Sequence, residues 1–105
     1  MKKKSTTSDP RPEVGMGVTM SVGSDRYPGT ITEVSASGKR IVFQEDVATR
    51  IDTNGMSESQ QYTFQQDPNG SMHIATKRKD GRWRITGGKT PVTIGIRGKY
   101  YDFSF

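Results

Sequence analysis

Apolar and polar residues alternate over short runs of the chain, which is the pattern of half-buried β-strands. The first run follows Gly15 and places Met16, Val18, Met20 and Val22 at every second position. Later runs occupy 30–35, 39–44, 62–64, 72–76, 82–85, 92–96 and 101–105. No segment shows the 3.6-residue period of an amphipathic helix. The pattern therefore predicts about seven short strands in an all-β chain.

A hairpin and a bend are predicted in the first half of the chain. Residues 36–38, Ala-Ser-Gly, separate two of the runs, so Ile41 and Phe43 should face inward on the second strand of a hairpin. On the first strand, Ile31 and Val34 would fall on opposite faces if the strand were regular. A β-bulge between them is therefore predicted, because it would turn both toward the core.

The connections between the runs differ in predicted length. Residues 23–29 are expected to form a wide loop, and residues 45–60 a long polar loop with few apolar anchors. Pro68-Asn69-Gly70 and Asp80-Gly81 are turn signals that reverse the chain between strands. Many short strands joined by turns in 105 residues favour one antiparallel sheet that curls into a small barrel.

The order of elements in the first third of the chain has a known counterpart. A strand over 14–20, the wide loop, the Gly-led segment 29–34 and the hairpin leading to Ile41-Val42-Phe43 resemble the start of Src-homology-3-like (SH3-like) barrels of the KOW and Tudor kind. The predicted fold class is accordingly all-β, a small, strongly bent antiparallel SH3-like barrel with an extra C-terminal hairpin and strand. Residues 1–13 are predicted to be a flexible basic N-terminal arm, and residues 14–105 a single β-barrel domain.

A second resemblance rests on short segments spread along the chain. They are Gly15-Met16-Gly17, Ser24-Asp25-Arg26, Gln44-Glu45-Asp46, Asn54-Gly55-Met56-Ser57, Asp67-Pro68-Asn69-Gly70, Gly81-Arg82-Trp83 and Tyr100-Tyr101-Asp102-Phe103-Ser104-Phe105. In these segments the chain resembles small, uncharacterised proteins encoded by bacteriophages and prophages. The resemblance implies a phage origin and a place in the host cell cytoplasm. It brings neither an activity nor assigned site residues.

Composition removes several classes of chemistry. The chain has no cysteine, which excludes disulfides, Cys-ligated zinc, iron–sulfur clusters and thiolate catalysis. No apolar run approaches the roughly 20 residues that span a bilayer. Polar residues follow Met1 and the three lysines after it, where a signal peptide would carry an apolar stretch. A cytoplasmic protein without membrane contact is predicted.

The net charge of +5 is unevenly distributed along the chain. Residues 14–69 carry a net charge of −3, whereas residues 70–105 carry +6. A basic third beside an acidic middle favours an anionic partner on one side of the molecule. The alternative interpretation is a solvated basic face that only keeps a small domain soluble.

The basic third contains a predicted hairpin around Asp80-Gly81, a pair typical of two-residue turns. Such a turn would place Lys79 opposite Arg82 and Lys77 opposite Arg84. Like charges directly opposite each other destabilise a sheet by on the order of several tenths of a kcal/mol per pair. A nucleic-acid backbone would offset that cost. Alternatively, the charges only protect an exposed edge from aggregation.

The same turn assigns the two faces of this hairpin. The inward face would carry Met72, Ile74, Thr76, Trp83 and Ile85. The outward face would carry His73, Ala75, Lys77, Lys79, Arg82 and Arg84. Trp83 is therefore interpreted as a core residue and not as a platform for stacked bases.

These observations predict a phage-type intracellular binding module that engages nucleic acid or a nucleoprotein through the basic hairpin. The predicted contacts are Lys77, Lys79, Arg82 and Arg84, extended by Lys89, Arg97 and Lys99, with Arg26 and Tyr27 as loop contacts. The alternative is a protein-binding modulator or inhibitor of a host factor, a defence or transcription component, that uses the acidic middle or the 45–60 loop. A structural component of a virion is a third class, for which the sequence offers no support of its own.

Catalytic machinery is not recognisable in the sequence. His73 is the only histidine and stands in a predicted strand without an oriented carboxylate. Asp52, Asn54 and Glu58 depart from the spacing of a calcium loop, and the neighbours Glu45-Asp46 would point to opposite faces of a strand. No catalytic residue, metal site, cofactor or small-molecule substrate is predicted, and the protein is not expected to be an enzyme. The oligomeric state is left open.

Overall fold

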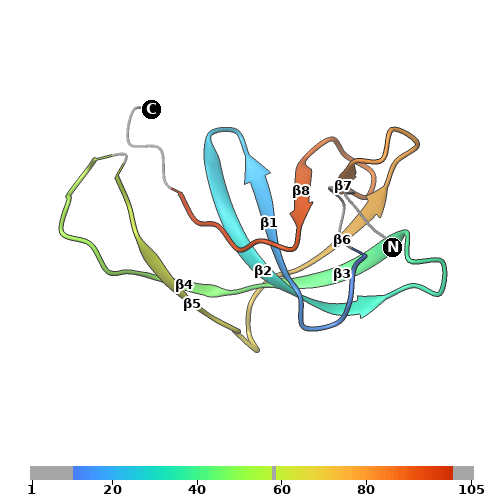
Figure 1. Ribbon diagram of the computed structural model, residues 1–105, viewed down its shortest axis with the longest axis horizontal. Coiled ribbons are helices and arrows are strands. Elements are labelled where there is room, and N and C mark those ends of the chain that lie inside the picture. The colour runs from blue at the N-terminus through green and yellow to red at the C-terminus, as the bar shows by residue number, and fades with distance from the viewer. Residues whose placement is uncertain (1–10, 58, 101–105) are drawn as a thin grey trace, which may run out of the picture.

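The computed structural model describes residues 11–57 and 59–100, which form strands and turns and no helix (Figure 1). The strands are β1 (Gly17–Val22), β2 (Asp25–Val34), β3 (Arg40–Glu45), β4 (Val47–Arg50), β5 (Tyr62–Gln65), β6 (Met72–Lys77), β7 (Trp83–Ile85) and β8 (Pro91–Ile94). The all-β prediction is confirmed. Within these two ranges there is no helix with the length and apolar character that crossing a membrane requires.

Six strands form a closed antiparallel barrel in the order β1-β2-β3-β6-β7-β8. The barrel closes where β8 returns to β1 and Val18 pairs with Ile94. Closure leaves these strands without a free edge for pairing with other chains. β4 and β5 form a separate two-stranded sheet that projects from the barrel (Figure 1). The architecture is consistent with the predicted small SH3-like barrel.

The core fills the inside of the barrel with side chains from every barrel strand. Its buried apolar members are Val18, Met20, Ile31, Ile41, Phe43, Ala75, Trp83, Val92 and Ile94. Ile41, Phe43 and Trp83 face inward as the alternation predicts. Complete burial of a large apolar side chain contributes about 1.5–3 kcal/mol, so these few residues carry much of the stability of a chain with a thin core.

The predicted bend in β2 is confirmed. The register of β2 against β3 shifts between Ile31 and Glu33, which marks a β-bulge. Ile31 is thereby buried, and Val34 packs against the core from the other side of the bulge. A Cβ atom on Gly29 would lie 2.8 Å from the Phe43 ring, so only glycine permits the close approach of β2 to the core.

The wide loop predicted over residues 23–29 is wrong. Only Gly23 and Ser24 connect β1 to β2, and Gly23 adopts a φ of 59°, as a two-residue hairpin turn requires. The remainder of the segment pairs with β1 through backbone hydrogen bonds. Such bonds form whether or not apolar and polar side chains alternate, so the sequence pattern did not indicate this strand. Arg26 and Tyr27 therefore lie in a strand and not in a loop.

The long loop predicted over residues 45–60 is also partly wrong, because it contains β4. β4 pairs with β5, with Ala48 opposite Phe64 and Arg50 opposite Tyr62. Its residues alternate between exposed and half-buried. Apolar and polar residues do not alternate in the same way along it, so the sequence pattern did not predict this strand. β6 pairs with β3 and β7 and not with β5, so the chain does not form the predicted reversal from β5 into β6.

Two predicted elements lie outside the described residues: the last strand at 101–105, and residues 1–10 of the predicted arm. Next to the first of them, Tyr100 forms an isolated bridge with Arg26 of β2. Its amide donates to the Arg26 carbonyl (3.1 Å), and its carbonyl accepts from the Arg26 amide (2.9 Å).

Candidate nucleic-acid interface

The basic hairpin consists of β6, β7 and a three-residue loop formed by Lys79, Asp80 and Gly81. The Gly81 amide donates to the Arg78 carbonyl (2.9 Å), and the Arg78 amide donates to the Arg82 carbonyl (2.8 Å). Gly81 has a φ of 84°, the left-handed conformation that closes a three-residue hairpin loop. The predicted two-residue turn at Asp80-Gly81 is therefore wrong.

The longer loop shifts the pairing of the hairpin by one residue. Lys77 lies opposite Trp83, and Thr76 lies opposite Arg84. The predicted pairing of Lys77 with Arg84 and of Lys79 with Arg82 is wrong, and the observed register instead places Arg78 opposite Arg82. A functional interpretation of these cations needs support of another kind.

The shift also reverses the predicted faces of β6, because a slip of one residue moves every side chain to the other face. Ala75 is completely buried, whereas Met72 and Ile74 are exposed. The predictions of Ala75 and His73 on the outward face, and of Met72 and Ile74 in the core, are wrong. The prediction for Trp83 is confirmed, since its side chain is only 5% exposed.

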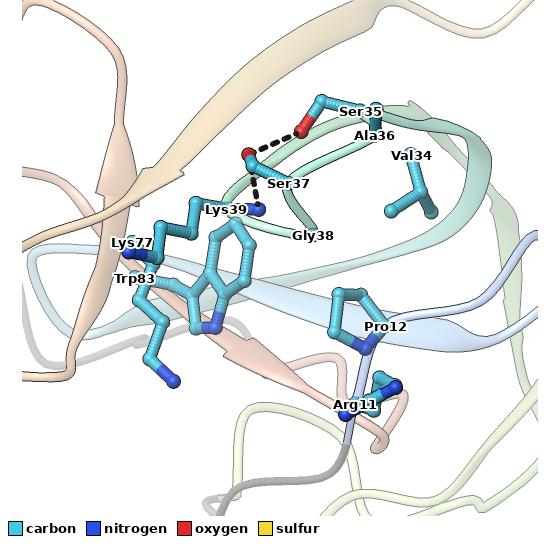
Figure 2. Close-up of a pocket in the computed structure, with 10 residues that line it drawn as sticks. All are labelled: Arg11, Pro12, Val34, Ser35, Ala36, Ser37, Gly38, Lys39, Lys77 and Trp83. Carbon is cyan, nitrogen blue, oxygen red and sulfur yellow. Dashed lines mark hydrogen bonds between the residues drawn. The ribbon is translucent and has the colours of Figure 1, made fainter.

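Lys77 consequently stands on the same face as Trp83, where a pocket of about 530 Å³ opens at the end of the barrel. The lining comes from residues 11–12, residues 34–39, Lys77 and Trp83. Figure 2 shows the indole of Trp83 in the middle, with Lys39 and Lys77 on one side and Arg11 and Pro12 on the other. We call this pocket the basic pocket.

The basic pocket carries three basic side chains, those of Arg11, Lys39 and Lys77, and none of the described residues that line it is acidic. The hairpin between β2 and β3 is tied to β6 beside it, because the Lys77 amide donates to the Lys39 carbonyl (2.8 Å). Sequence reasoning missed Arg11 and Lys39 as site residues. Both are far from Lys77 along the chain, and Lys39 reaches it only through the pairing of β3 with β6.

The loop that carries Lys39 is braced by two serine hydroxyls. Ser37 Oγ accepts from the Lys39 amide (3.2 Å; Figure 2). Ser35 Oγ accepts from the Arg40 amide (3.2 Å). Gly38 has a φ of 74° and donates its amide to the Ser35 carbonyl (2.9 Å). These bonds fix the backbone at the rim of the pocket.

Trp83 contributes a polar group to this pocket. Its indole Nε1 makes no hydrogen bond within the described part of the chain, and it is not among the completely buried nitrogen atoms that lack a partner. Nε1 therefore keeps some contact with solvent, although Trp83 as a whole is only 5% exposed. A tryptophan whose N–H is not satisfied internally offers a donor to a ligand.

The predicted contacts at the hairpin tip differ in how far their charge is already balanced. Lys79 and Arg82 are exposed. Arg84 forms an ion pair with Asp80 (3.3 Å). The amide of Arg82 and then the guanidinium of Arg84 hold the pKa of the Asp80 carboxyl below its usual range. Arg84 is thus partly neutralised, whereas no ion pair is recorded for Lys79 or Arg82 within the described residues.

The other predicted contacts do not line the basic pocket. Lys89 borders a second hollow on the outer side of the β6–β7 hairpin. Arg97 donates from Nε to Asp46 Oδ2 (2.9 Å). Lys99 Nζ lies 4.2 Å from the centre of the Tyr27 ring, and Arg26 is an exposed residue of β2. The predicted single row of cations is not formed.

His73 has a carboxylate partner that the sequence does not reveal. Pairing of β3 with β6 places Phe43 opposite His73 and brings His73 Nε2 within 2.6 Å of Glu45 Oε2. The imidazole also contacts the Phe43 ring, with 5.2 Å between the ring centres. Neither His73 nor Glu45 lines the basic pocket. The pair links two adjacent strands.

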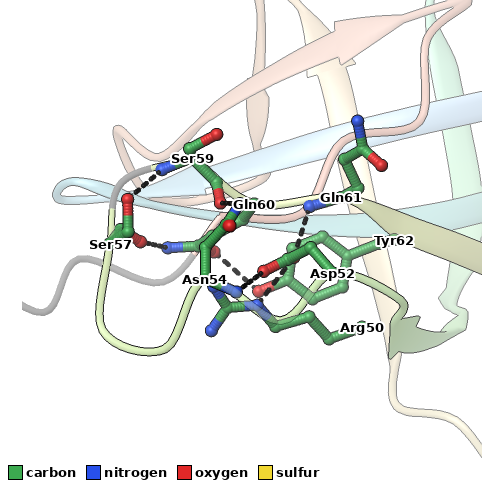
Figure 3. A network of polar contacts seen from close by, with 8 residues as sticks. All are labelled: Arg50, Asp52, Asn54, Ser57, Ser59, Gln60, Gln61 and Tyr62. Atoms are coloured by element: carbon green, nitrogen blue, oxygen red, sulfur yellow. Dashed lines mark hydrogen bonds and ion pairs between the residues drawn. The ribbon is translucent and has the colours of Figure 1, made fainter.

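The acidic group considered for calcium is engaged in the loop between β4 and β5 (Figure 3). Asp52 accepts from Arg50 Nε (2.8 Å), from the Gln61 amide (2.7 Å) and from the Asn54 amide (2.9 Å). The hydrogen bond from Arg50, and then that from Gln61, hold the pKa of the Asp52 carboxyl well below its usual range. Glu58 lies outside the described residues, and the described ones contain no group of three or more potential metal ligands.

Comparison of the chain with protein families, with characterised proteins and with solved structures finds no match.

Proposed function

We propose that the protein binds nucleic acid through the basic end of the barrel, by which we mean the basic pocket together with Lys79 and Arg82. The observation that carries the proposal is the set of three cations around the pocket, with no acidic side chain among the described residues that line it. Cations that lack internal partners gain most from contact with phosphates, because they release condensed counterions without breaking an ion pair. Three cations of this surface, Lys77, Lys79 and Arg82, belong to the basic last third of the chain.

The geometry of the barrel supports a directed contact. Lys39 and Lys77 come from two hairpins that are joined by a backbone hydrogen bond, so their spacing is fixed by the sheet. Lys79 and Arg82 extend the same end along the β6–β7 loop. Basic side chains on a rigid scaffold hold a nucleic-acid backbone in one position better than the same charges on a mobile segment.

The test is binding of labelled single-stranded and duplex oligonucleotides over a series of salt concentrations. We expect affinity that falls steeply with salt. The double variant Lys39→Gln with Lys77→Gln should lower affinity about tenfold, which is about 1.4 kcal/mol, and reduce the slope for duplex by about 1.8. Glutamine keeps most of the side-chain length.

The control is the double variant Lys89→Gln with Lys99→Gln, which removes the same charge away from the basic pocket. An equal loss in both double variants would mean that only net charge matters. Absence of binding at about 50 mM salt would overturn the proposal. A phage or prophage origin and a cytoplasmic location remain predictions that this experiment does not address.

A second proposal, binding to a host protein factor, is favoured by the projecting β4–β5 sheet. Val47, Ile51 and Met56 on this sheet and its loop are 44%, 57% and 72% exposed. Exposed apolar side chains that gather on a projection are typical of protein contacts. Capture from a nuclease-treated host lysate, compared with the variant Ile51→Ser with Met56→Ser, tests this proposal. A partner lost in the variant supports it, and a partner lost only with nuclease treatment supports nucleic acid.

A further inference from the structure

We infer that the basic pocket holds one unpaired nucleotide, so that the protein prefers single-stranded over duplex nucleic acid. The inference rests on the proposed function and adds the class of ligand. Its starting point is shape. Neutralising the phosphates of a duplex needs only cations on an open surface, whereas these cations surround a hollow of about 530 Å³. That volume is typical of pockets that take a small molecule or one unit of a polymer.

The polar groups in the pocket are donors and cations. Trp83 Nε1 is not completely buried and has no acceptor within the described part of the chain. The amides of Ala36 and Ser37 at the rim make no hydrogen bond within the described part of the chain. Together with Arg11, Lys39 and Lys77, they select a ligand that is anionic and rich in acceptors, as a nucleotide phosphate and base carbonyls are.

The pocket also has apolar walls, supplied by Pro12, Val34 and Ala36. A phosphate group would gain nothing from contact with these apolar side chains, whereas a base can pack its apolar faces against them. Trp83 does not act as a stacking platform because its ring is 5% exposed. It offers the accessible N–H at its edge, which bonds an oxygen of the base or of the phosphate.

Paired bases cannot use these donors. In a duplex each base is stacked between its neighbours, and bringing one into a pocket requires unstacking and unpairing at a cost of a few kcal/mol. A single strand enters without that cost. The preference therefore follows from the pocket, whereas the charge alone attracts both forms.

Trp83 is the only tryptophan of the chain, so its fluorescence reports occupancy of this pocket directly. The test titrates the protein at low salt with a short oligothymidylate and with a blunt duplex of the same length. We expect a saturable change in emission with the single strand, a much smaller change with the duplex, and at least tenfold higher affinity for the single strand.

Two variants make the test specific, with labelled oligonucleotides as the readout. Trp83→Phe keeps an aromatic ring in the core and removes the N–H. Ala36→Phe fills the pocket from an exposed loop position and leaves the core intact. Each should lower single-strand affinity about tenfold and reduce the ratio of single-strand to duplex affinity. Ala36→Phe decides the matter if Trp83→Phe does not fold, as judged by circular dichroism.

The possible results separate this inference from the proposed function. Equal binding of both forms without a change in emission would overturn the nucleotide pocket and leave the proposed function standing. A free nucleotide that binds as tightly as the strand would overturn the preference for a strand. No binding of either form would overturn both. Loss of single-strand preference in Ala36→Phe supports the inference.

Discussion

The protein holds its cations in two different ways. At the junction of the barrel with β4, Arg97 donates to Asp46 (2.9 Å) and to the Thr30 hydroxyl (3.0 Å), and the Asp46 side chain is only 1% exposed. At the basic end, Lys39 and Lys77 face a pocket that no acidic side chain lines within residues 11–57 and 59–100. The first arrangement joins β2, the start of β4 and the segment after β8. The second leaves positive charge available to a partner.

The difference matters because both groups look alike in the sequence. Arg97 and Lys77 belong to the same basic third of the chain, and both were predicted to contact nucleic acid. They differ in whether an acidic side chain of the protein pairs with them: Arg97 is paired with Asp46 and so contributes to the fold. Removing a partner from the junction should therefore destabilise the protein, whereas removing charge at the basic end should not.

The largest effect is expected for Asp46→Asn. This change removes the buried charge that binds Arg97 and weakens the acceptor for Thr30, so unfolding in urea should show a loss of about 2–3 kcal/mol. The exposed Glu33→Gln is the control and should change stability by less than about 0.5 kcal/mol. A loss below about 0.5 kcal/mol in Asp46→Asn would remove the distinction between the two sites.

A smaller effect is expected for Gly81→Ala, which probes the loop that sets the register of the basic hairpin. A side chain at a φ of 84° is strained, and the expected loss of stability is about 1 kcal/mol. Gly88→Ala in the next turn is a matched control, because the atom nearest to its Cβ beyond the adjacent residues would be the Ile85 carbonyl oxygen at 3.8 Å, and its φ is not positive. Equal effects in a thermal melt would argue against a three-residue loop.

Still smaller is the effect expected for Lys39→Gln with Lys77→Gln on stability. Neither lysine has an ion pair within the described residues, so the free energy of unfolding should change by less than about 0.5 kcal/mol while binding weakens. The same urea titration used for Asp46→Asn measures it. A loss comparable to that of Asp46→Asn would show that these lysines serve the fold.

The most local effect is the acid sensitivity of the β4–β5 loop. The lowered pKa of Asp52 means that its ion pair with Arg50 stabilises the loop fully above the ordinary value of about 3.9, and that this contribution is lost as pH falls through the lower folded-state pKa. The Gln61 amide should exchange faster with solvent in acid. In Asp52→Asn it should exchange faster at neutral pH, and unchanged exchange would contradict the role of the carboxylate.

The sequence alone determined the features that depend on neighbouring residues. Alternation identified the inward faces of Ile41 and Phe43, and the misfit of Ile31 with Val34 indicated the bulge in β2. Side chains point alternately to the two faces of any strand, so this information is local. It also identified Trp83 as a core residue.

Only the tertiary structure decided the partners and the register. Glu45 and His73 are 28 residues apart, and Asp46 and Arg97 are 51 apart, so no local pattern connects them. The faces of β6 depended on whether the loop at Gly81 has two residues or three, a choice made by pairing with β3 and β7 together. The basic pocket exists because pairing of β3 with β6 brings two separate hairpins together, and the distribution of charge along the sequence does not reveal that pairing.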